Sequence, residues 1–350
     1  MFPMLTLYAI VFLIGFLGNL WVIISLSRIL YRTWSPANSV FQHIALYILS
    51  LSIVDLLVLS MVPLLIGYFA NNSWPFGYIA CKIFWTVENV NKILSVAILT
   101  VMSFERLLAV ARPINNINCR RFNFTTVITT LIIIAFLLNS PIIYYAETRD
   151  YQELGENGSI FDTKTICVSE LPDTIMPYFI IACFFMGYIL PAICIAFCYI
   201  FLIRYIRRRP RNGKIKFVSS YAKKVTRSIL KVICFHFFCW SPFWIMVLIP
   251  FLRIVGIVGE FDAMYITIFK WVTSFLPYIN SMGNWYFYAA MNREMRESAS
   301  TIFRRSDLPT LNILINRGRA KRLLKSKNQK QLPCTDVILE DRNSIAIRTN

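Results

Sequence analysis

Seven apolar segments, each long enough to cross a bilayer as a helix, constrain this chain more than any other feature. A bilayer core of about 30 Å needs roughly 20 residues in helical form, with the backbone polar groups satisfied inside each segment. The predicted spans are residues 5–27, 43–69, 79–102, 124–145, 177–203, 227–251 and 263–288. The sequence therefore predicts an all-α membrane protein built as a seven-transmembrane helix bundle.

The composition agrees with this architecture. The chain of 350 residues is 57% hydrophobic and 15% charged, which is too apolar for the surface of a soluble domain. The first apolar segment is longer than the apolar region of a cleavable signal peptide, so we expect it to stay in the protein as an anchor.

The basic residues lie mainly on alternate connecting segments. The segments after the first and third spans carry 2 and 4 Lys and Arg, and the segment after the fifth span carries 11 when the start of the sixth span up to Lys231 is included. The tail carries 13 of the chain's 36. By the positive-inside rule these segments are cytoplasmic and the amino terminus is outside. The net charge of +18 is thus explained by orientation in the plasma membrane, and we expect no nucleic-acid partner.

The segment 146–176 is predicted to form an acidic outer rim. It holds Arg149 and Lys164 against seven acids, which are Glu147, Asp150, Glu153, Glu156, Asp162, Glu170 and Asp173. Cys167 in this segment and Cys81 at the outer end of the third span both face an oxidising compartment, so we predict a disulfide between them. Asn157 is the sequon expected to carry a glycan. The sequence has two His residues and no paired CxxC motif, so it does not indicate a zinc-type metal site.

Polar side chains inside the spans fall on matching helix faces. Ionisable groups at bilayer depth cost a few kcal/mol or more, so each suggests a function. The third span and the turn after it carry Glu88, Asn91, Ser95, Met102, Glu105 and Arg106 at roughly helical spacing. A polar cluster linking three spans is expected from Asp55, Asn91, Ser95, Asn280, Ser281 and Asn284. Two interpretations of this cluster stay open, a sodium ion at Asp55 or a water-filled hydrogen-bond network.

Short motifs in six spans, in order and at fitting spacings, resemble rhodopsin-like (class A) G-protein-coupled receptors. They are Gly18-Asn19, LSIVDLL around Asp55, Cys81 followed 25 residues later by Arg106 in FERLLAV, Pro191 with Tyr199, CWSP at 239–242 and NSMGNWYFY at 280–288. WPFGYIACK, VNKILSV, AKKVTR and YINSMGN are similar to the branch of somatostatin, allatostatin C and opioid receptors. We expect an invertebrate member of that branch.

The resemblance implies roles for particular residues. A ligand pocket would be lined by Glu88, Lys92, Trp240, Phe243, Trp244 and Tyr278. Switching and G-protein coupling would involve Glu105, Arg106, Tyr199, Trp240, Pro242 and Tyr288. The implied partners are an extracellular peptide, a heterotrimeric G protein of the inhibitory class, arrestin and membrane lipids. No cofactor is expected beyond an allosteric sodium ion.

The charge of the ligand is left open by Lys92. A carboxylate at Glu88 would pair with a Lys, Arg or amine of the ligand. Lys92 lies four residues after Glu88, which is a favourable spacing for an ion pair within the helix. If the two residues neutralise each other, the ligand need not be cationic, and Lys92 would be available for a ligand carboxylate.

The chain departs from the receptor pattern at four positions. Trp285 stands where these receptors have the Pro of Asn-Pro-x-x-Tyr, and His236 stands where they usually have Phe. Ile132 replaces the usual Trp of the fourth span, and Leu107 replaces the Tyr after Arg106. Trp285 and His236 lie where activation would be decided, so weak or constitutive signalling is an alternative.

The sequence thus predicts a neuropeptide receptor and not an enzyme. The competing interpretations are a biogenic-amine receptor, a degenerate receptor-like protein and a transporter or intramembrane enzyme; inverted repeats and a catalytic dyad are absent from the sequence. Residues 1–303 would form the receptor domain, ending in a short amphipathic helix, and residues 304–350 a disordered cytoplasmic tail.

Overall fold

The computed structural model describes residues 2–33, 39–111, 123–154, 160–208, 213–254, 256, 259 and 262–306. Two compact units are present: Met1–Arg112 with Phe122–Asn292, and Pro113–Arg121 with Arg293–Asn350. In the second unit the described residues are 293–306, and they are helical. The predicted glycosylation site, Asn157, and the predicted tail after residue 306 lie outside the described residues. The predicted domain boundary at residue 303 stays a prediction.

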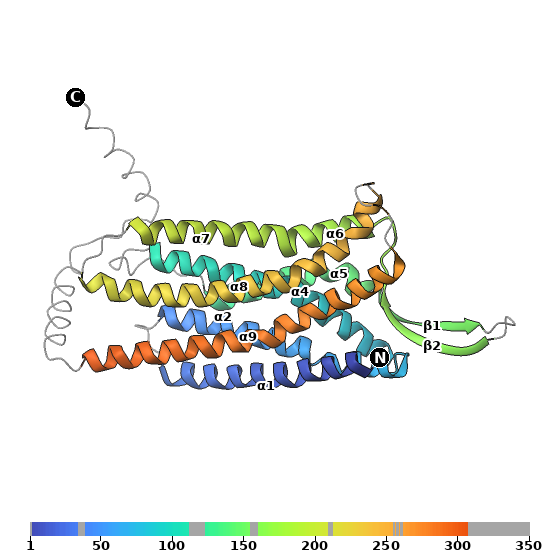
Figure 1. Ribbon diagram of the computed structural model, residues 1–350, viewed down its shortest axis with the longest axis horizontal. Helices are drawn as coiled ribbons and strands as arrows, with labels where there is room; N and C mark the ends of the chain where they lie inside the picture. The colour runs from blue at the N-terminus through green and yellow to red at the C-terminus, as the bar shows by residue number, and fades with distance from the viewer. Residues whose placement is uncertain are drawn as a thin grey trace, which may run out of the picture. The chain divides into compact units, whose positions relative to one another are not determined.

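The described residues are almost entirely helical, as predicted (Figure 1). The helices are α1 (Phe2–Thr33), α2 (Ser39–Leu59), α3 (Val62–Asn71), α4 (Gly77–Ala111), α5 (Phe124–Tyr145), α6 (Met176–Phe184), the π-helical turn η2 (Phe185–Ile189), α7 (Leu190–Arg208), α8 (Gly213–Ile254) and α9 (Ala263–Ser306). Among the described residues, six helical stretches are long and apolar enough to cross a membrane. The further helix of the bundle, α9, is longer still but carries more polar side chains, among them Lys270, Asn280 and Asn284.

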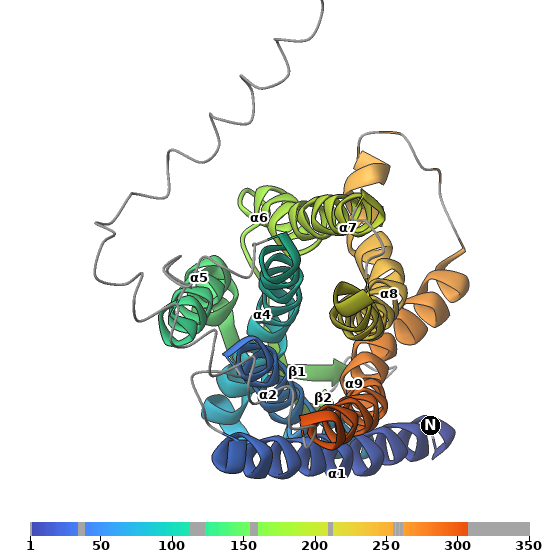
Figure 2. The same cartoon turned by 90° about the vertical axis from the view of Figure 1, so that its left-hand side faces the viewer.

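Helix α4 is the central element of the first unit. It packs against α2, α5, α7 and α8, while α1 packs against α2 and α3. Figure 2 shows this arrangement end-on, with α2, α5, α7 and α8 around α4. The polar stripe predicted for the third span lies on this helix. Glu88 and Glu105 are half-buried, and the other stripe residues are buried in the bundle, namely Asn91, Ser95, Met102 and Arg106.

Two predicted spans contain a break that follows from proline chemistry. Proline has no N–H to donate and its ring crowds the preceding turn. Before Pro63, the backbone at Ser60 and Met61 leaves the α-helix, and the Met61 N–H donates to the carbonyl of Val58 instead of following the i−4 pattern. Before Pro191, the backbone widens into η2, where the Leu190 N–H donates to the carbonyl of Phe185.

Helix α9 continues to Ser306 as one element. The helix predicted after the seventh span is therefore helical, but it extends α9 and is not a separate helix. Residues 289–306 contain no Gly or Pro to end the helix, and the family's interrupting proline is replaced by Trp285. The Trp285 ring lies on Gly18 of α1, where an added Cβ would come within 2.3 Å of the indole. A residue without a side chain is therefore required at position 18.

A β-hairpin, which the sequence analysis did not predict, follows α5. Strands β1 (Ala146–Leu154) and β2 (Ile160–Ser169) pair antiparallel, with Thr148 opposite Cys167. Figure 1 shows the hairpin at the end of the bundle where α1 begins, hereafter the hairpin end.

Two linkages hold the hairpin on the bundle. The predicted disulfide is confirmed: Cys81 of α4 and Cys167 of β2 are bonded, with 5.6 Å between their Cα atoms. Two residues earlier in β2, the Thr165 carbonyl accepts a hydrogen bond of 2.7 Å from the Trp74 N–H, and the Thr165 N–H donates to Ser73 Oγ. The buried Trp74 ring of the WPFG motif also contacts Phe76 and Phe84. The motif therefore anchors the hairpin.

Candidate functional site

Glu88 of α4 forms a direct contact with α9. The Tyr278 hydroxyl donates a 2.7 Å hydrogen bond to Glu88 Oε1. The Tyr278 ring in turn meets Tyr8 of α1 edge-on, with 5.6 Å between ring centroids. The carboxylate is therefore held by a specific partner, and three helices are joined at this point.

Lys92 lies one turn further along α4. Its Nζ donates to Asn89 Oδ1 at 2.9 Å and stands 4.9 Å from the centroid of the Phe243 ring, a cation–π contact. Lys92 and Glu88 interact electrostatically, but in the part of the chain that the structure describes no direct ion pair joins them. The sequence left two partners open for Lys92, Glu88 and a ligand carboxylate. The structure shows Lys92 bound to Asn89 and not directly to Glu88, and a ligand carboxylate stays a prediction.

The aromatic ring that contacts the Lys92 ammonium belongs to a group of rings on α8. Phe243 meets Trp240 and Trp244 edge-on, at 5.5 and 5.7 Å between centroids. The six residues predicted to bind ligand are thus brought into one group, hereafter the Glu88 cluster. Its members are Glu88, Lys92, Trp240, Phe243, Trp244 and Tyr278.

Sequence reasoning missed three residues that support this cluster. Asn89 binds Lys92, and its spacing of three residues on a helix would have indicated the contact. The Tyr188 hydroxyl of η2 shares a 2.7 Å hydrogen bond with Ser241 of α8, and this bond connects the two elements. Tyr8 is the third, and no short-range pattern connects it with Tyr278.

His236 lies directly beneath the cluster. Its buried ring packs on Trp240 with 5.8 Å between centroids, and it meets Phe237 edge-on at 5.6 Å. It therefore occupies an aromatic packing position, as the Phe of related receptors would, with a polar ring. Pro242, which interrupts the hydrogen bonding of α8, follows two residues after Trp240.

Asp55 is the centre of a second polar group. Asn284 Nδ2 of α9 donates to Asp55 Oδ2 at 2.8 Å. Within the described residues, several buried side-chain atoms of α2 and α9 have no hydrogen-bond partner that meets strict geometry. They are Asp55 Oδ1, Ser281 Oγ, Asn284 Oδ1 and both polar atoms of the Asn280 amide, although Ser281 lies close enough to interact with the Asp55 carboxylate. We call Asp55, Asn280, Ser281 and Asn284 the Asp55 cluster. Its unpaired oxygens fit either waters or a small hard cation.

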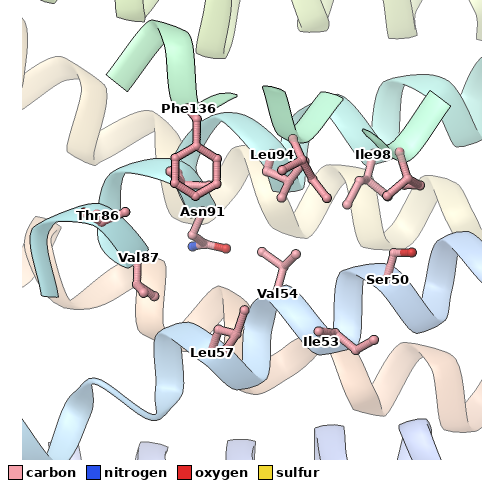
Figure 3. Close-up of a pocket in the computed structure, with 13 residues that line it drawn as sticks. Ser50, Ile53, Val54, Leu57, Thr86, Val87, Asn91, Leu94, Ile98 and Phe136 are labelled. Carbon is pink, nitrogen blue, oxygen red and sulfur yellow. The ribbon is translucent and has the colours of Figure 1, made fainter. Parts of the chain in front are cut away.

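Ser95 and Asn91 were also predicted to belong to this network, but their side chains make other contacts. The Ser95 hydroxyl donates to the backbone carbonyl of Asn91 at 2.7 Å. The Asn91 side chain lines a cavity between α2, α4 and α5 that none of the other predicted network residues lines (Figure 3). Among the described residues there is no group of three His, Cys, Asp or Glu that would suit a transition metal.

The predicted switch residues lie further along the bundle. Arg106, Tyr199 and Tyr288 are all buried, and the Tyr199 hydroxyl lies within electrostatic reach of the Arg106 guanidinium. Glu105 is partly exposed. The structure thus places Tyr199 and Arg106 near each other, while their roles in switching stay predictions.

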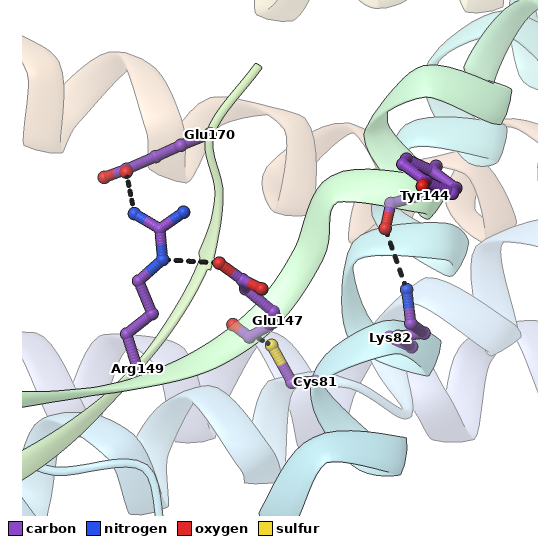
Figure 4. Close-up of polar contacts among 6 residues, drawn as sticks. All are labelled: Cys81, Lys82, Tyr144, Glu147, Arg149 and Glu170. Atoms are coloured by element: carbon purple, nitrogen blue, oxygen red, sulfur yellow. Dashed lines mark hydrogen bonds and ion pairs between the residues drawn. The ribbon is translucent and has the colours of Figure 1, made fainter. Parts of the chain in front are cut away.

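An arginine at the base of the hairpin bridges two of the acids of this segment (Figure 4). The Arg149 guanidinium binds Glu147 and Glu170, and the hydrogen bond and charge of Glu147 raise the pKa of Arg149. Lys82 of α4 donates to the carbonyls of Ile143 and Tyr144 at 2.9 and 3.0 Å and so caps the end of α5. Cys81 Sγ lies 3.2 Å from the Glu147 carbonyl, a contact without a hydrogen bond since a disulfide sulfur carries no proton.

A multi-pass helical bundle with these polar and aromatic groups in its interior is the architecture of a membrane receptor. The chain belongs to the 7 transmembrane receptor (rhodopsin family), whose family model matches residues 18–288. This is a receptor family and not an enzyme family, and its membrane-spanning helices make the chain a multi-pass plasma-membrane protein. The predicted family is thereby confirmed.

Relatives with curated names show which receptors of this family the chain is similar to. The chain is 30% identical to somatostatin receptor type 2 of Mus musculus over 305 residues, which are 85% of this chain and 75% of that receptor. It is 29% identical to somatostatin receptor type 4 of Rattus norvegicus, over 83% of this chain and 70% of that one. It is 27% identical to neuropeptide receptor 18 of Caenorhabditis elegans, over 85% and 66%. The chain thus spans about two thirds to three quarters of the length of these relatives, and the predicted resemblance to somatostatin receptors is confirmed.

Proposed function

We propose that this protein is a G-protein-coupled receptor, not an enzyme, that binds an extracellular neuropeptide at the hairpin end of its bundle. The Glu88 cluster is the observation that carries the proposal. It joins α4, α8 and α9 through one group of buried and half-buried charged and aromatic side chains, and Tyr8 links this group to α1. A ligand that alters any of its contacts acts on all four helices.

The chemistry of the hairpin end suits a peptide with basic groups. Glu88 has a carboxylate with hydrogen-bonding capacity beyond the one bond from Tyr278. Lys92 uses one of its three donors on Asn89, so it can also bind a ligand carboxylate or carbonyl. Asp150 and Asp173 add negative charge to the hairpin and the segment after it, and such charge steers cationic ligands toward their site. A peptide carrying both kinds of group uses the site more fully than an amine does.

The amino terminus and the hairpin would be extracellular in this proposal. The opposite end would bind a heterotrimeric G protein of the inhibitory class, the class favoured by the likeness to somatostatin receptors, and arrestin and anionic lipids are further partners there. Agonist binding would shift a two-state equilibrium in proportion to its differential affinity for the active state. Arg106, Tyr199 and Tyr288 would then rearrange at the G-protein end.

A sodium ion in the Asp55 cluster is part of the proposal. Asp55, Ser281 and Asn284 each offer a buried oxygen without a hydrogen-bond partner. A bound cation would favour the receptor state with the compact cluster. We expect agonist affinity to fall several-fold when sodium replaces choline in the buffer, and Asp55→Asn to abolish the difference. Equal affinities in both buffers for the unchanged receptor would exclude the ion.

The function is tested by expressing the full chain in cells and recording inhibition of cyclic AMP formation and G-protein dissociation. A panel of basic and amidated peptides is compared with biogenic amines. We expect a peptide response that Glu88→Gln weakens at least tenfold in potency and that Arg106→Ala abolishes at equal surface expression. A response to amines with all peptides silent would contradict the peptide assignment.

A receptor with high basal signalling is the second candidate, and the packing of His236 against Trp240 favours it. A polar ring in an aromatic packing position weakens the resting arrangement. Ligand-free G-protein activation that falls in His236→Phe would identify this behaviour, whereas a silent ligand-free receptor would exclude it.

A further inference from the structure

The outer edge of β2 in the hairpin is already occupied. Thr165 of β2 points its N–H and its carbonyl away from β1, because the N–H donates to Ser73 Oγ at 3.1 Å and the carbonyl accepts from the Trp74 N–H at 2.7 Å. Facing pairs in an antiparallel ladder alternate. In one pair the backbone groups of both residues point toward the partner strand, and in the next pair they point away from it. The contacts of Thr165 therefore determine which backbone groups of β1 point outward.

The outer edge of β1 is open. Asp150 faces Thr165 in the hairpin, and Thr148 and Gln152 are the neighbouring residues of β1 with the same orientation. The N–H and carbonyl groups of these three residues therefore point away from β2. Within the described residues, these backbone groups have no hydrogen-bond partner. We call this row of backbone groups the β1 edge.

The β1 edge is accessible from outside the bundle. Asp150 and Gln152 are exposed, Tyr151 between them is 59% exposed, and Thr148 is half-buried. Figure 1 shows the hairpin projecting from the hairpin end of the bundle. In the end-on view of Figure 2, β1 is seen between α4 and α9, two of the helices that the Glu88 cluster joins. An exposed strand edge of this kind is a template for a further strand.

The side chains along the edge favour a strand of a particular composition. Residues that face each other on adjacent strands have their side chains on the same face of the sheet. A residue that pairs with Asp150 would therefore lie beside its carboxylate, which accepts one 2.9 Å hydrogen bond from Thr165 Oγ1 and has capacity for further donors. The exposed Tyr151 ring lies on the opposite face. A strand with basic side chains on one face and apolar side chains on the other matches both.

We propose that the β1 edge binds an extended segment of the extracellular peptide, which adds antiparallel to β1 as a third strand with a basic side chain beside Asp150. The inference rests on the peptide-receptor function proposed above, and it identifies the part of the ligand that the hairpin recognises. A peptide backbone has the alternating donors and acceptors that such an edge pairs with, and an amine has none. The β1 edge therefore distinguishes the two ligand classes.

A second copy of the chain is a poorer occupant of the β1 edge. In a symmetric antiparallel pairing of two β1 edges centred on Asp150, the two Asp150 carboxylates would face each other. Like charges directly opposite in a sheet are destabilising. A basic peptide replaces this repulsion by an attraction.

The test uses the purified full chain in lipid nanodiscs and a fluorescein-labelled synthetic peptide, Lys-Val-Lys-Val-Lys-amide. Its alternation puts Lys on one face and Val on the other, and its five residues span about 16 Å as a strand, the length of the segment from Thr148 to Gln152. Fluorescence anisotropy measures binding. N-methylation of the central Lys removes an N–H that points to the β1 edge, so it should weaken binding at least tenfold. N-methylation of the Val that follows is the matched control, because its N–H points away from β1, and it should leave the affinity within twofold.

Two receptor variants test the edge from the other side. Gln152→Pro removes an N–H of the β1 edge and keeps the hydrogen bonds between β1 and β2, since that N–H points outward. It should weaken binding of the unmethylated peptide at least fivefold. Asp150→Asn keeps the backbone groups and removes the charge, so it should weaken binding less than Gln152→Pro does. Thermal unfolding of each variant shows whether it is folded, and the methylated peptides test the unchanged receptor in any case.

The outcomes separate this inference from the proposed function. Equal binding of the two methylated peptides, or no binding of the unmethylated peptide, would overturn the strand pairing even if the receptor responds to peptides in cells. Binding with the expected methylation pattern in a receptor that responds to no peptide would contradict the proposed function and support the strand pairing. A dimer that Gln152→Pro dissociates in the absence of peptide would assign the edge to a second copy and overturn the proposal.

Discussion

The Glu88 and Asp55 clusters both lie inside the bundle and both link α9 to other helices, but they differ in how many of their polar groups have partners. In the first, Glu88 binds Tyr278 and Lys92 binds Asn89 and the Phe243 ring. In the second, one hydrogen bond between Asn284 and Asp55 is surrounded by buried atoms without partners. The first cluster is therefore complete within the protein, whereas the second needs water or an ion. Removing a group should harm the first more than the second.

The largest effect is expected from Glu88→Ala. The substitution leaves the Tyr278 hydroxyl without its acceptor and Lys92 without a neighbouring negative charge. Breaking a buried charged contact on one side costs about 3 kcal/mol. Thermal and denaturant unfolding of the purified receptor would measure this loss. Glu88→Gln is the matched control, since it keeps an acceptor and should cost less than half as much. A loss below about 0.5 kcal/mol for Glu88→Ala would show that the cluster is not self-contained.

A smaller effect is expected from Tyr278→Phe. It removes one hydrogen bond to a charged group and keeps the ring that packs on Tyr8, so the unfolding free energy should fall by about 2 kcal/mol. Tyr188→Phe removes a neutral hydrogen bond to Ser241 and should cost only about 1 kcal/mol. The difference between the two variants measures the contribution of the Glu88 charge, and equal losses would argue against it.

Lys92→Met should change stability less and ligand selection more. The lost cation–π contact with Phe243 is worth about 1 kcal/mol. Removing the ammonium also leaves Glu88 as the sole charge of its cluster, so potency should rise for cationic ligands and fall for ligands that carry a carboxylate. Concentration–response curves for a matched pair of peptides, with and without a carboxylate, would show the shift. Parallel changes for both peptides would mean that Lys92 does not select by charge.

The smallest change in stability is expected from Asp55→Asn. The amide can still accept the hydrogen bond from Asn284, and the neighbouring atoms are already unpaired. The unfolding free energy in sodium-free buffer should stay within about 0.5 kcal/mol of the unchanged receptor. A loss near that of Glu88→Ala would remove the contrast between the two clusters.

The parts of the fold that local patterns determine were predictable. Span positions follow from apolar length, and the Cys81–Cys167 disulfide follows from the side of the membrane that each residue faces. The continuation of α9 past residue 288 could also have been expected, because residues 289–306 contain no Gly or Pro to end a helix. The short amphipathic helix was expected from the mixture of charged and apolar residues after the seventh span, and these residues are helical as part of α9.

The features that escaped prediction depend on contacts between distant residues or on fine backbone geometry. Helix spacing allowed Lys92 to pair with Glu88, but the surrounding packing directs it toward Asn89 and Phe243. The hairpin pairs two segments whose composition is mainly polar, so no apolar alternation marked it. Grouping Asn91 with Asp55 rested on helix spacing alone, and the structure places its side chain in the α2–α4–α5 cavity.

The contact between Gly18 and Trp285 makes the residue types allowed at these two positions depend on each other, although 267 residues separate them in the sequence. Since the indole occupies the space of a side chain at position 18, a larger residue there can be accepted only with a smaller one at position 285. A side chain at position 18 should therefore appear only after Trp285 has been replaced by a smaller residue, whereas Trp285 can be replaced while Gly18 stays. A survey of closely related sequences would reveal this dependence as a missing combination, a side chain at position 18 together with Trp at position 285.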